Sequence, residues 1–175
     1  MKNIKNFCIL AFLAVFFSSC GFMFGNDEYY DAKMNSEKRG REIAEHFISC
    51  VNRKDKAELK SMFSQSIKNK FQDLDAKITE LFEALPDGIH QYEISPFVGG
   101  TGSFASWEVI YNKETVRIFI PEIKANTGDE DIYIAINYTH INHEKPDEVG
   151  INEIEFIDRT DRAHEKKITI GSYEA

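Results

Sequence analysis

Cysteine is scarce in this sequence, with three residues in a chain of 175. Cys8 lies inside an apolar N-terminal stretch and Cys20 at its end, so only Cys50 remains in the rest of the chain. A domain built from that remainder cannot form an internal disulfide. Cys50 lies at helical spacing from Phe47, which favours a small buried side chain over a reactive thiol.

An excess of positive charge is also lacking. The sequence has 21 Lys and Arg residues against 29 Asp and Glu, which gives a formal net charge of −8. No basic stripe offsets this balance, and a chain this acidic repels phosphate backbones. We therefore expect no nucleic-acid partner.

No apolar run is long enough to hold the chain in a membrane as a helix. The longest, Phe7 to Phe17, follows Lys2 and Lys5 and contains no charged residue. A membrane-spanning helix needs about 20 apolar residues. A short basic start followed by an apolar stretch of this length is typical of a secretory signal.

The apolar run ends at Ser18-Ser19-Cys20-Gly21, which resembles the lipobox of bacterial lipoproteins, with Phe17 where an aliphatic residue is usual. The resemblance implies a signal peptide at 1–19, a diacylglyceryl group on Cys20 and a tether at 20–35. The membrane would then be a partner through the lipid anchor, and the protein would be extracytoplasmic, on the cell membrane or the outer membrane. The alternative is an ordinary signal peptide in which Cys20 has no role.

Three helices are expected between residues 36 and 85. The first begins near Asn35 or Ser36 and ends in the segment NRKD. Its apolar side chains recur at three- and four-residue steps. Asp55, with Glu58 three residues later, has the capping-box pattern and predicts a second, short helix through Phe63.

The third expected helix is long and continuous. Ser64 is its predicted cap, and Pro86-Asp87-Gly88 follows its last apolar residue, Leu85. At 1.5 Å per residue it would be about 33 Å long, enough to cross a sheet. We expect Phe71 and Phe82 to fill the space between this helix and the sheet.

After Gly88 the apolar period changes from 3.6 to 2, and β-branched and aromatic residues dominate. Helices followed by strands indicate an α+β fold with an antiparallel sheet. The segment GGTGS at 99–103 is expected to be a flexible connection, and KANTGDED at 124–131 a hairpin connection. The predicted strands are IHQYEI (89–94), SFASWEVIYN (103–112), TVRIFIPEI (115–123), DIYIAINYTHI (131–141), GINEIEFIDR (150–159) and KKITIGSY (166–173).

Several segments resemble a bacterial family described as domain of unknown function 5104. They are NRKDKAELKSMFS, FQDLDAKITELFEAL and INYTHINHEKPDEVGINEIEFIDR, with EKPDEVGI at 144–151 as the strongest local match. The resemblance covers about 36–175 and implies one domain with a nuclear transport factor 2-like fold. Such a fold is a cone of three N-terminal helices packed on a curved antiparallel sheet. The family brings no catalytic residues to transfer, and its fold serves enzymes and binding modules alike.

A pocket between the helices and the concave face of the sheet is the expected site. Its candidate wall residues are Trp107, Tyr111, Arg117, Tyr133 and Asn137. Which face of the strands is concave depends on the register, because a one-residue shift exchanges the two faces.

No metal or cofactor site is expected. His140 and His143 are three residues apart in a predicted strand, so their side chains point to opposite faces.

Two hypotheses for function remain. One is a non-catalytic binding or interaction domain with an unknown protein or small-molecule ligand. The alternative is a small-molecule enzyme, an isomerase, dehydratase or hydrolase, that uses the cone pocket.

Overall fold

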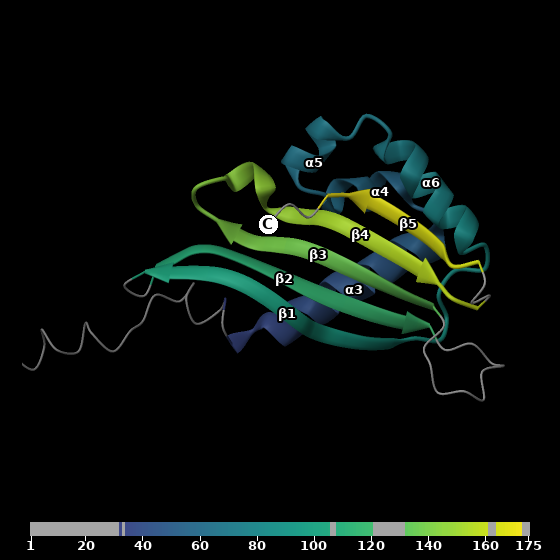
Figure 1. Ribbon diagram of the computed structural model, residues 1–175, viewed down its shortest axis with the longest axis horizontal. Helices are drawn as coiled ribbons and strands as arrows, with labels where there is room; N and C mark the ends of the chain where they lie inside the picture. Colours follow the sequence, from purple (N-terminus) through teal and green to yellow (C-terminus); the bar gives the residue numbers. More distant parts are fainter. Residues whose placement is uncertain (1–31, 33, 106–107, 121–131, 161–163, 173–175) are drawn as a thin grey trace, which may run out of the picture.

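The computed structural model describes residues 32, 34–105, 108–120, 132–160 and 164–172. The expected signal peptide, Cys20, most of the expected tether, the segment KANTGDED and Trp107 lie outside these residues. Within them the chain has an α+β fold in which N-terminal helices pack on an open antiparallel sheet of five strands (Figure 1). This arrangement confirms the expected fold class and is consistent with a nuclear transport factor 2-like fold.

Among the described residues from Ser36 onward the helices come before the strands, as the sequence predicts, but four helices are described here rather than three. A single 3-10 turn, η1, interrupts the strands that follow. The described helical elements are α3 (Ser36–Arg53), α4 (Lys56–Met62), α5 (Gln65–Lys70), α6 (Leu74–Ala84) and η1 (Pro146–Glu148).

The strands pair only with their neighbours in sequence, in the order β1-β2-β3-β4-β5. Each pair is antiparallel. The strand bounds are β1 Glu93–Ala105, β2 Glu108–Ile120, β3 Ile132–Asn142, β4 Gly150–Asp158 and β5 Lys166–Gly171.

The predicted helix starts are confirmed at two caps. The side chain of Asp55 accepts a hydrogen bond from the backbone nitrogen of Glu58 at 3.0 Å. Ser64 accepts one from the backbone nitrogen of Ile67 at 3.3 Å. Each cap satisfies a backbone N–H that the first turn of a helix leaves without an intrahelical partner.

The expected continuous helix from Ser64 to Leu85 is wrong. α5 ends at Lys70, Phe71 takes an extended conformation (φ −98°, ψ 97°), and α6 begins at Leu74. The chain changes direction at the break, as Figure 1 shows. The cause is tertiary, because the chain just before α5 is bonded to β4 while α6 packs beside β5. Such packing overrides a favourable helical period.

The predicted strand boundaries around the glycines are also wrong. GGTGS is not a flexible connection but part of β1, where Gly100 pairs with Glu114 and Gly102 with Asn112. The predicted strand at 103–112 instead contains the end of β1 and the start of β2. The β1–β2 register shifts between Ser95 and Gly99, which is consistent with glycine at an irregular point of a strand.

The helices cover one face of the sheet. On β2, Glu114, Val116 and Ile118 are buried on this face, and the residues between them point the other way. α3 crosses this face so closely at Gly40 that an added Cβ would lie 1.8 Å from the carbonyl oxygen of Pro96. The space between helices and sheet is a packed core whose fully buried members include Phe47, Phe63 and Phe156.

Phe82 belongs to this core as expected, with 9% of its surface exposed. Phe71 does not. The break before α6 leaves its ring only partly buried, at the edge of the core. The expectation that both rings fill the space over the sheet is therefore correct for Phe82 alone.

Candidate functional site

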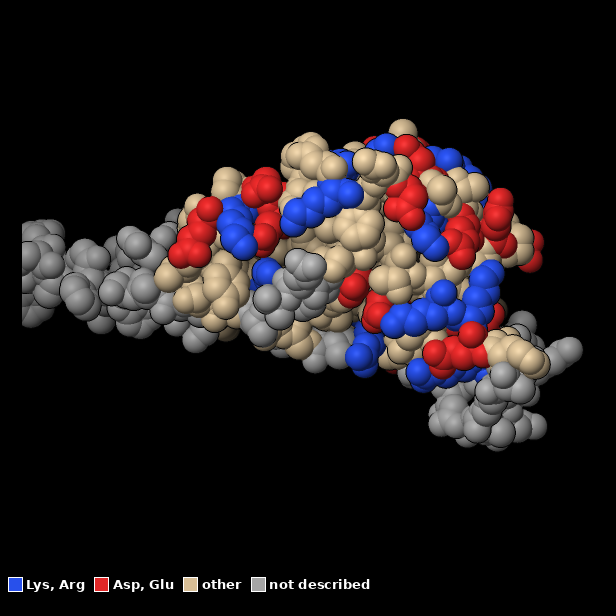
Figure 2. Space-filling model, turned by 45° about the horizontal axis from the view of Figure 1, so that its top comes forward, with Lys and Arg blue, Asp and Glu red and all other residues tan. Residues whose placement is uncertain are grey.

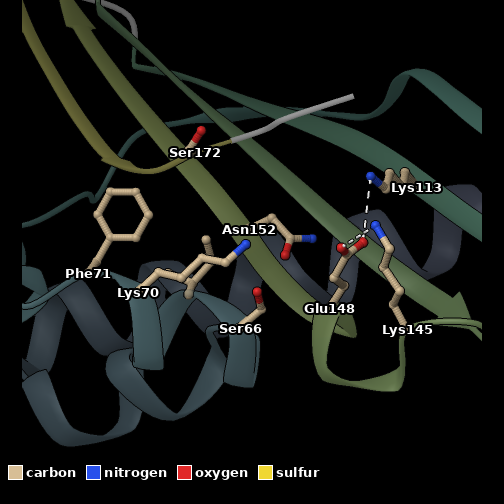
Figure 3. Close-up of a pocket in the computed structure, with 9 residues that line it drawn as sticks. Ser66, Lys70, Phe71, Lys113, Lys145, Glu148, Asn152 and Ser172 are labelled. Carbon is tan, nitrogen blue, oxygen red and sulfur yellow. Dashed lines mark ion pairs between the residues drawn. The ribbon is translucent and has the colours of Figure 1, made fainter.

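A pocket of about 480 Å³ lies between α5 and the η1 loop, over the start of β4 (Figure 3). This volume falls within the usual range of small-molecule sites, about 300–1,000 Å³. Its lining combines lysines, a carboxylate, an amide, hydroxyls and two apolar side chains. The lining residues are Ser66, Ile67, Lys70, Phe71, Lys113, Lys145, Glu148, Asn152 and Ser172.

The two walls of the pocket are joined at their base. The backbone nitrogen of Ser64, just before α5, donates to the carbonyl oxygen of Ile151 on β4 at 2.8 Å. Gly150 lies at this junction with φ +119°, and an added Cβ would be 2.9 Å from the nitrogen of Ser64. The next-to-last residue of the segment EKPDEVGI is therefore a glycine, because the backbone conformation and the close contact both exclude a side chain.

The η1 wall carries an ionic group centred on Glu148. Its carboxylate lies 3.2 Å from Nζ of Lys145 and 3.9 Å from Nζ of Lys113. The amide of Asn142 also donates to it, at 3.2 Å. The Lys113 side chain is only 15% exposed, whereas that of Lys145 is 65% exposed. This wall thus combines one recessed cation with one solvated cation.

Asn152 lies at the centre of the pocket in Figure 3. Its amide nitrogen donates to Oγ1 of Thr139 at 2.7 Å and to the carbonyl oxygen of Gly150 at 3.3 Å. Asn137 pairs with Glu153 and Tyr138 with Ile151, so Asn152 is the extra residue of a β-bulge. The bulge turns its side chain to the face of Thr139, away from the core.

The α5 wall supplies the remaining cation and the apolar surface. Lys70 extends from the last turn of α5 toward Asn152 in Figure 3, and Phe71 stands beside it. Ile67 and the buried Ser66 complete this wall. The break between α5 and α6, which sequence analysis missed, thus places the Phe71 ring at the pocket.

Four of the five predicted wall residues are described, and all four lie on the face of the sheet opposite the helices. Arg117 pairs across the strands with Ala135, and Tyr133 lies on the same face, 5.9 Å from the Arg117 guanidinium. Asn137 accepts from Thr115 at 2.6 Å and donates to Glu153 at 2.8 Å. Tyr111 is the fourth, and none of them lines the pocket. A ligand that contacted them would lie on this open face, not between sheet and helices.

A buried ionic cluster lies on the other side of the sheet, under α3. Glu114 is 2% exposed, lies 2.5 Å from the Arg39 guanidinium, and accepts hydrogen bonds from Asn112 and Tyr138. Burial, and then the Glu114 carboxylate, raise the pKa of Tyr138 well above its ordinary value. Both carboxylate oxygens are engaged, so the cluster stabilises the core rather than presenting a reactive group.

His46 and Cys50 lie four residues apart on α3, but they do not form a catalytic pair. Cys50 is fully buried in the core, and burial raises the pKa of its thiol. Nε2 of His46 lies 2.9 Å from the Glu58 carboxylate on α4 instead. A thiol with a raised pKa is protonated and unreactive, which agrees with the packing role expected of Cys50.

The fold and the site define this protein as an α+β domain with a polar pocket beside a packed core. The model of the family described as domain of unknown function 5104 matches residues 46–159, and the chain belongs to that family. No curated protein matches the chain.

Two further observations concern the described residues only. None of their helices is both long and apolar enough to cross a bilayer. No group of three or more His, Cys, Asp or Glu in the described part of the chain is placed to hold a metal ion.

Proposed function

We propose that this protein is a lipid-anchored bacterial lipoprotein whose domain binds a small molecule without transforming it. The observation that carries the proposal is the pocket between α5 and η1. Its side chains are of the kinds that orient a ligand, namely lysines, an amide and hydroxyls beside an aromatic ring. The ionisable groups of the core, Glu114, Tyr138 and Cys50, are buried away from it.

The anchor part of the proposal rests on Ser18-Ser19-Cys20 and on the short apolar stretch before it. Cleavage before Cys20 would remove Lys2 and Lys5 and change the net charge from −8 to −10. From Cys20 to Ala32 the chain spans at most about 40 Å when fully extended. The proposed location is therefore extracytoplasmic, with the domain held close to the membrane surface.

Metabolic labelling with a fatty-acid probe tests the anchor. The wild-type chain should be labelled and found with membranes, and Cys20→Ser should lose both properties. Equal labelling of the two chains would contradict the anchor and leave an ordinary signal peptide as the explanation.

A thermal-shift screen of a mixed metabolite library tests the binding function, using the purified full-length chain in detergent. Binding to the native state raises the melting temperature by mass action. Ser172→Trp places a large ring at the pocket and should abolish the shift. Ser61→Trp, at an exposed position of α4, should preserve it. Shifts that survive Ser172→Trp would contradict this pocket as the binding site.

The non-catalytic part of the proposal has its own readout. A compound found in the screen should be recovered chemically unchanged after prolonged incubation with the protein. Formation of a product that depends on the pocket residues would favour the enzyme alternative.

A further inference from the structure

The pocket is more positive than the protein that carries it. Its lining contains three lysines, Lys70, Lys113 and Lys145, and one acid, Glu148, a local balance of +2 in a chain of net charge −8. On the face drawn in Figure 2, basic and acidic side chains are otherwise interspersed. A hollow whose lining carries an excess of one charge raises the local concentration of ligands of the opposite charge.

The three lysines approach the pocket from different elements. Lys113 comes from β2, Lys145 from the loop before η1 and Lys70 from α5 (Figure 3). Because these elements lie around one hollow, an anion inside it can be reached from both walls. Convergence from several elements distinguishes this cluster from a row of solvated lysines on one helix.

Glu148 balances part of this charge while the pocket is empty. The 3.9 Å between its carboxylate and Lys113 exceeds a hydrogen-bond distance, so this ion pair is loose. Lys145, at 3.2 Å, is 65% exposed and lies on a loop. Because exposed ion pairs contribute little stability, an incoming oxyanion can replace Glu148 as the partner of Lys145 at small cost.

The rest of the lining indicates the shape of the ligand. Phe71 lies across the pocket from Glu148 in Figure 3. Ile67 of α5 is the other apolar side chain of the lining. Ser66, Asn152 and Ser172 supply neutral polar groups between the two walls. A ligand that satisfied both walls would carry an anionic group at one end and a ring or short hydrocarbon at the other.

We infer that the pocket recognises a small organic anion, a carboxylate or phosphate monoester joined to an apolar ring or short chain. The inference rests on the proposed binding function and names its ligand class. Lys113 and Lys145, with Lys70 from the opposite wall, bind the anionic group, and Phe71 packs against the apolar part. Glu148 sets the affinity by competing with the ligand for Lys113 and Lys145.

Titration calorimetry on the full-length chain in detergent, with phenyl phosphate as the probe, tests the inference. Inorganic phosphate and phenol, its two halves, should each bind more weakly than phenyl phosphate. Benzoate should also bind. Added salt should weaken binding of the anions but not of phenol, because it screens charge.

Matched variants test the roles of the residues. Lys70→Ala should weaken phenyl phosphate binding about tenfold, as loss of a charge-assisted hydrogen bond does. Lys68→Ala removes a lysine of the same helix that does not line the pocket, and it should leave binding unchanged. Melting of each variant without ligand shows whether it is folded.

Glu148→Gln is the most discriminating variant, because the inference predicts that it binds phenyl phosphate more tightly than the wild type does. Removing the competing carboxylate should tighten phenyl phosphate binding several-fold, whereas a pocket built for a cationic ligand should lose binding of that ligand. Weaker phenyl phosphate binding in Glu148→Gln, or binding of none of the anions, would overturn the inference.

Three outcomes show whether this inference fails alone or together with the proposed function. If neutral or cationic compounds raise the melting temperature through the pocket while phenyl phosphate and benzoate do not bind, the ligand class is wrong and the binding function stands. Binding only to phosphatidylglycerol vesicles would overturn the small-molecule inference in favour of a lipid headgroup. If no compound of any class acts through the pocket, both fail.

Discussion

At the scale of single residues, the pocket is formed by side chains whose orientation cannot be predicted from the neighbouring residues in the sequence. Simple alternation along β4 places Asn152 in phase with Ile154 and Phe156, which are core residues. The bulge moves Asn152 to the other face. The one local signal of the bulge was that Asn152, two residues after Gly150, is polar, whereas the later positions of the same alternation are apolar.

The same limit applies to the lysines of the pocket. Lys70, Lys113 and Lys145 come from three distant segments, and no spacing in the sequence relates them. By contrast, Cys50 and the caps Asp55 and Ser64 were predictable. Each of these depends on neighbours within about one helical turn.

The buried cluster around Glu114 leads to a prediction about alkaline pH. The pKa of Tyr138 is raised by burial and by Glu114, so the folded state keeps a proton that the unfolded state releases near its ordinary value of 10.0. Stability from this group is complete below that pH and is lost as the pH rises above it. The added slope should approach about 1.4 kcal/mol per pH unit.

Denaturant melts of the wild type and of Tyr138→Phe between pH 8 and about 11.5 measure this slope. The variant should be less stable at neutral pH, because Glu114 loses a buried donor, but its stability should fall less steeply at alkaline pH. Parallel curves for the two proteins would show that Tyr138 titrates as an ordinary tyrosine.

Phe82 and Lys77, both on α6, provide a second contrast between residues. Phe82 is a core side chain, and Phe82→Ala should lower the free energy of unfolding by about 3–5 kcal/mol. Lys77 pairs with Glu80 on the partly exposed side, and Lys77→Ala should cost less than about 0.5 kcal/mol. A loss under about 1 kcal/mol for Phe82→Ala would mean that the space under α6 is not tightly packed.

At the scale of elements, local patterns located the helices and strands better than they located the breaks between them. The start and end of α3 follow from its apolar stripe, but the bend at Phe71 depends on the hydrogen bond between Ser64 and Ile151, which are far apart in sequence. β1 runs through its glycines because β2 supplies a partner along most of its length. Neither of these long-range contacts can be predicted from a short stretch of sequence.

The junction of α5 with β4 can be tested through its glycine. Gly150→Ala forces a side chain into φ +119° and against the backbone of Ser64, and it should cost about 1–3 kcal/mol. Gly99→Ala is the matched control, because a Cβ there meets nothing within 4 Å. Denaturant melts should separate the two variants clearly, and equal stabilities would contradict the tight junction.

At the scale of the whole molecule, contacts with the domain extend to Ala32, before its expected start at residue 36. The carbonyl oxygen of Ala32 accepts hydrogen bonds from Arg39 at 2.9 Å and from Asn112 at 3.3 Å. These contacts join the end of the expected tether to the buried cluster of Glu114. Residues 20–35 have no apolar period, so no local pattern predicts these contacts.

Two truncated chains test this boundary. A chain that begins at Asp31 retains the Ala32 carbonyl, and one that begins at Met34 lacks it. The shorter chain should be less stable by about 1–3 kcal/mol, because buried donors of Arg39 and Asn112 lose an acceptor. Coinciding denaturant melts would show that the contacts of Ala32 add no stability.

The central claim is that the pocket between α5 and η1, rather than the part of the open sheet face around Arg117 and Tyr133 or the packed core, is the binding surface of this protein. Backbone amide chemical shifts of the isotope-labelled full-length chain, recorded by NMR during titration with phenyl phosphate, test it most directly. The account predicts shifts concentrated at Lys70, Phe71, Lys113, Glu148 and Asn152. Shifts concentrated at Arg117, Tyr133 and Asn137, or no saturable shifts at all, would contradict it.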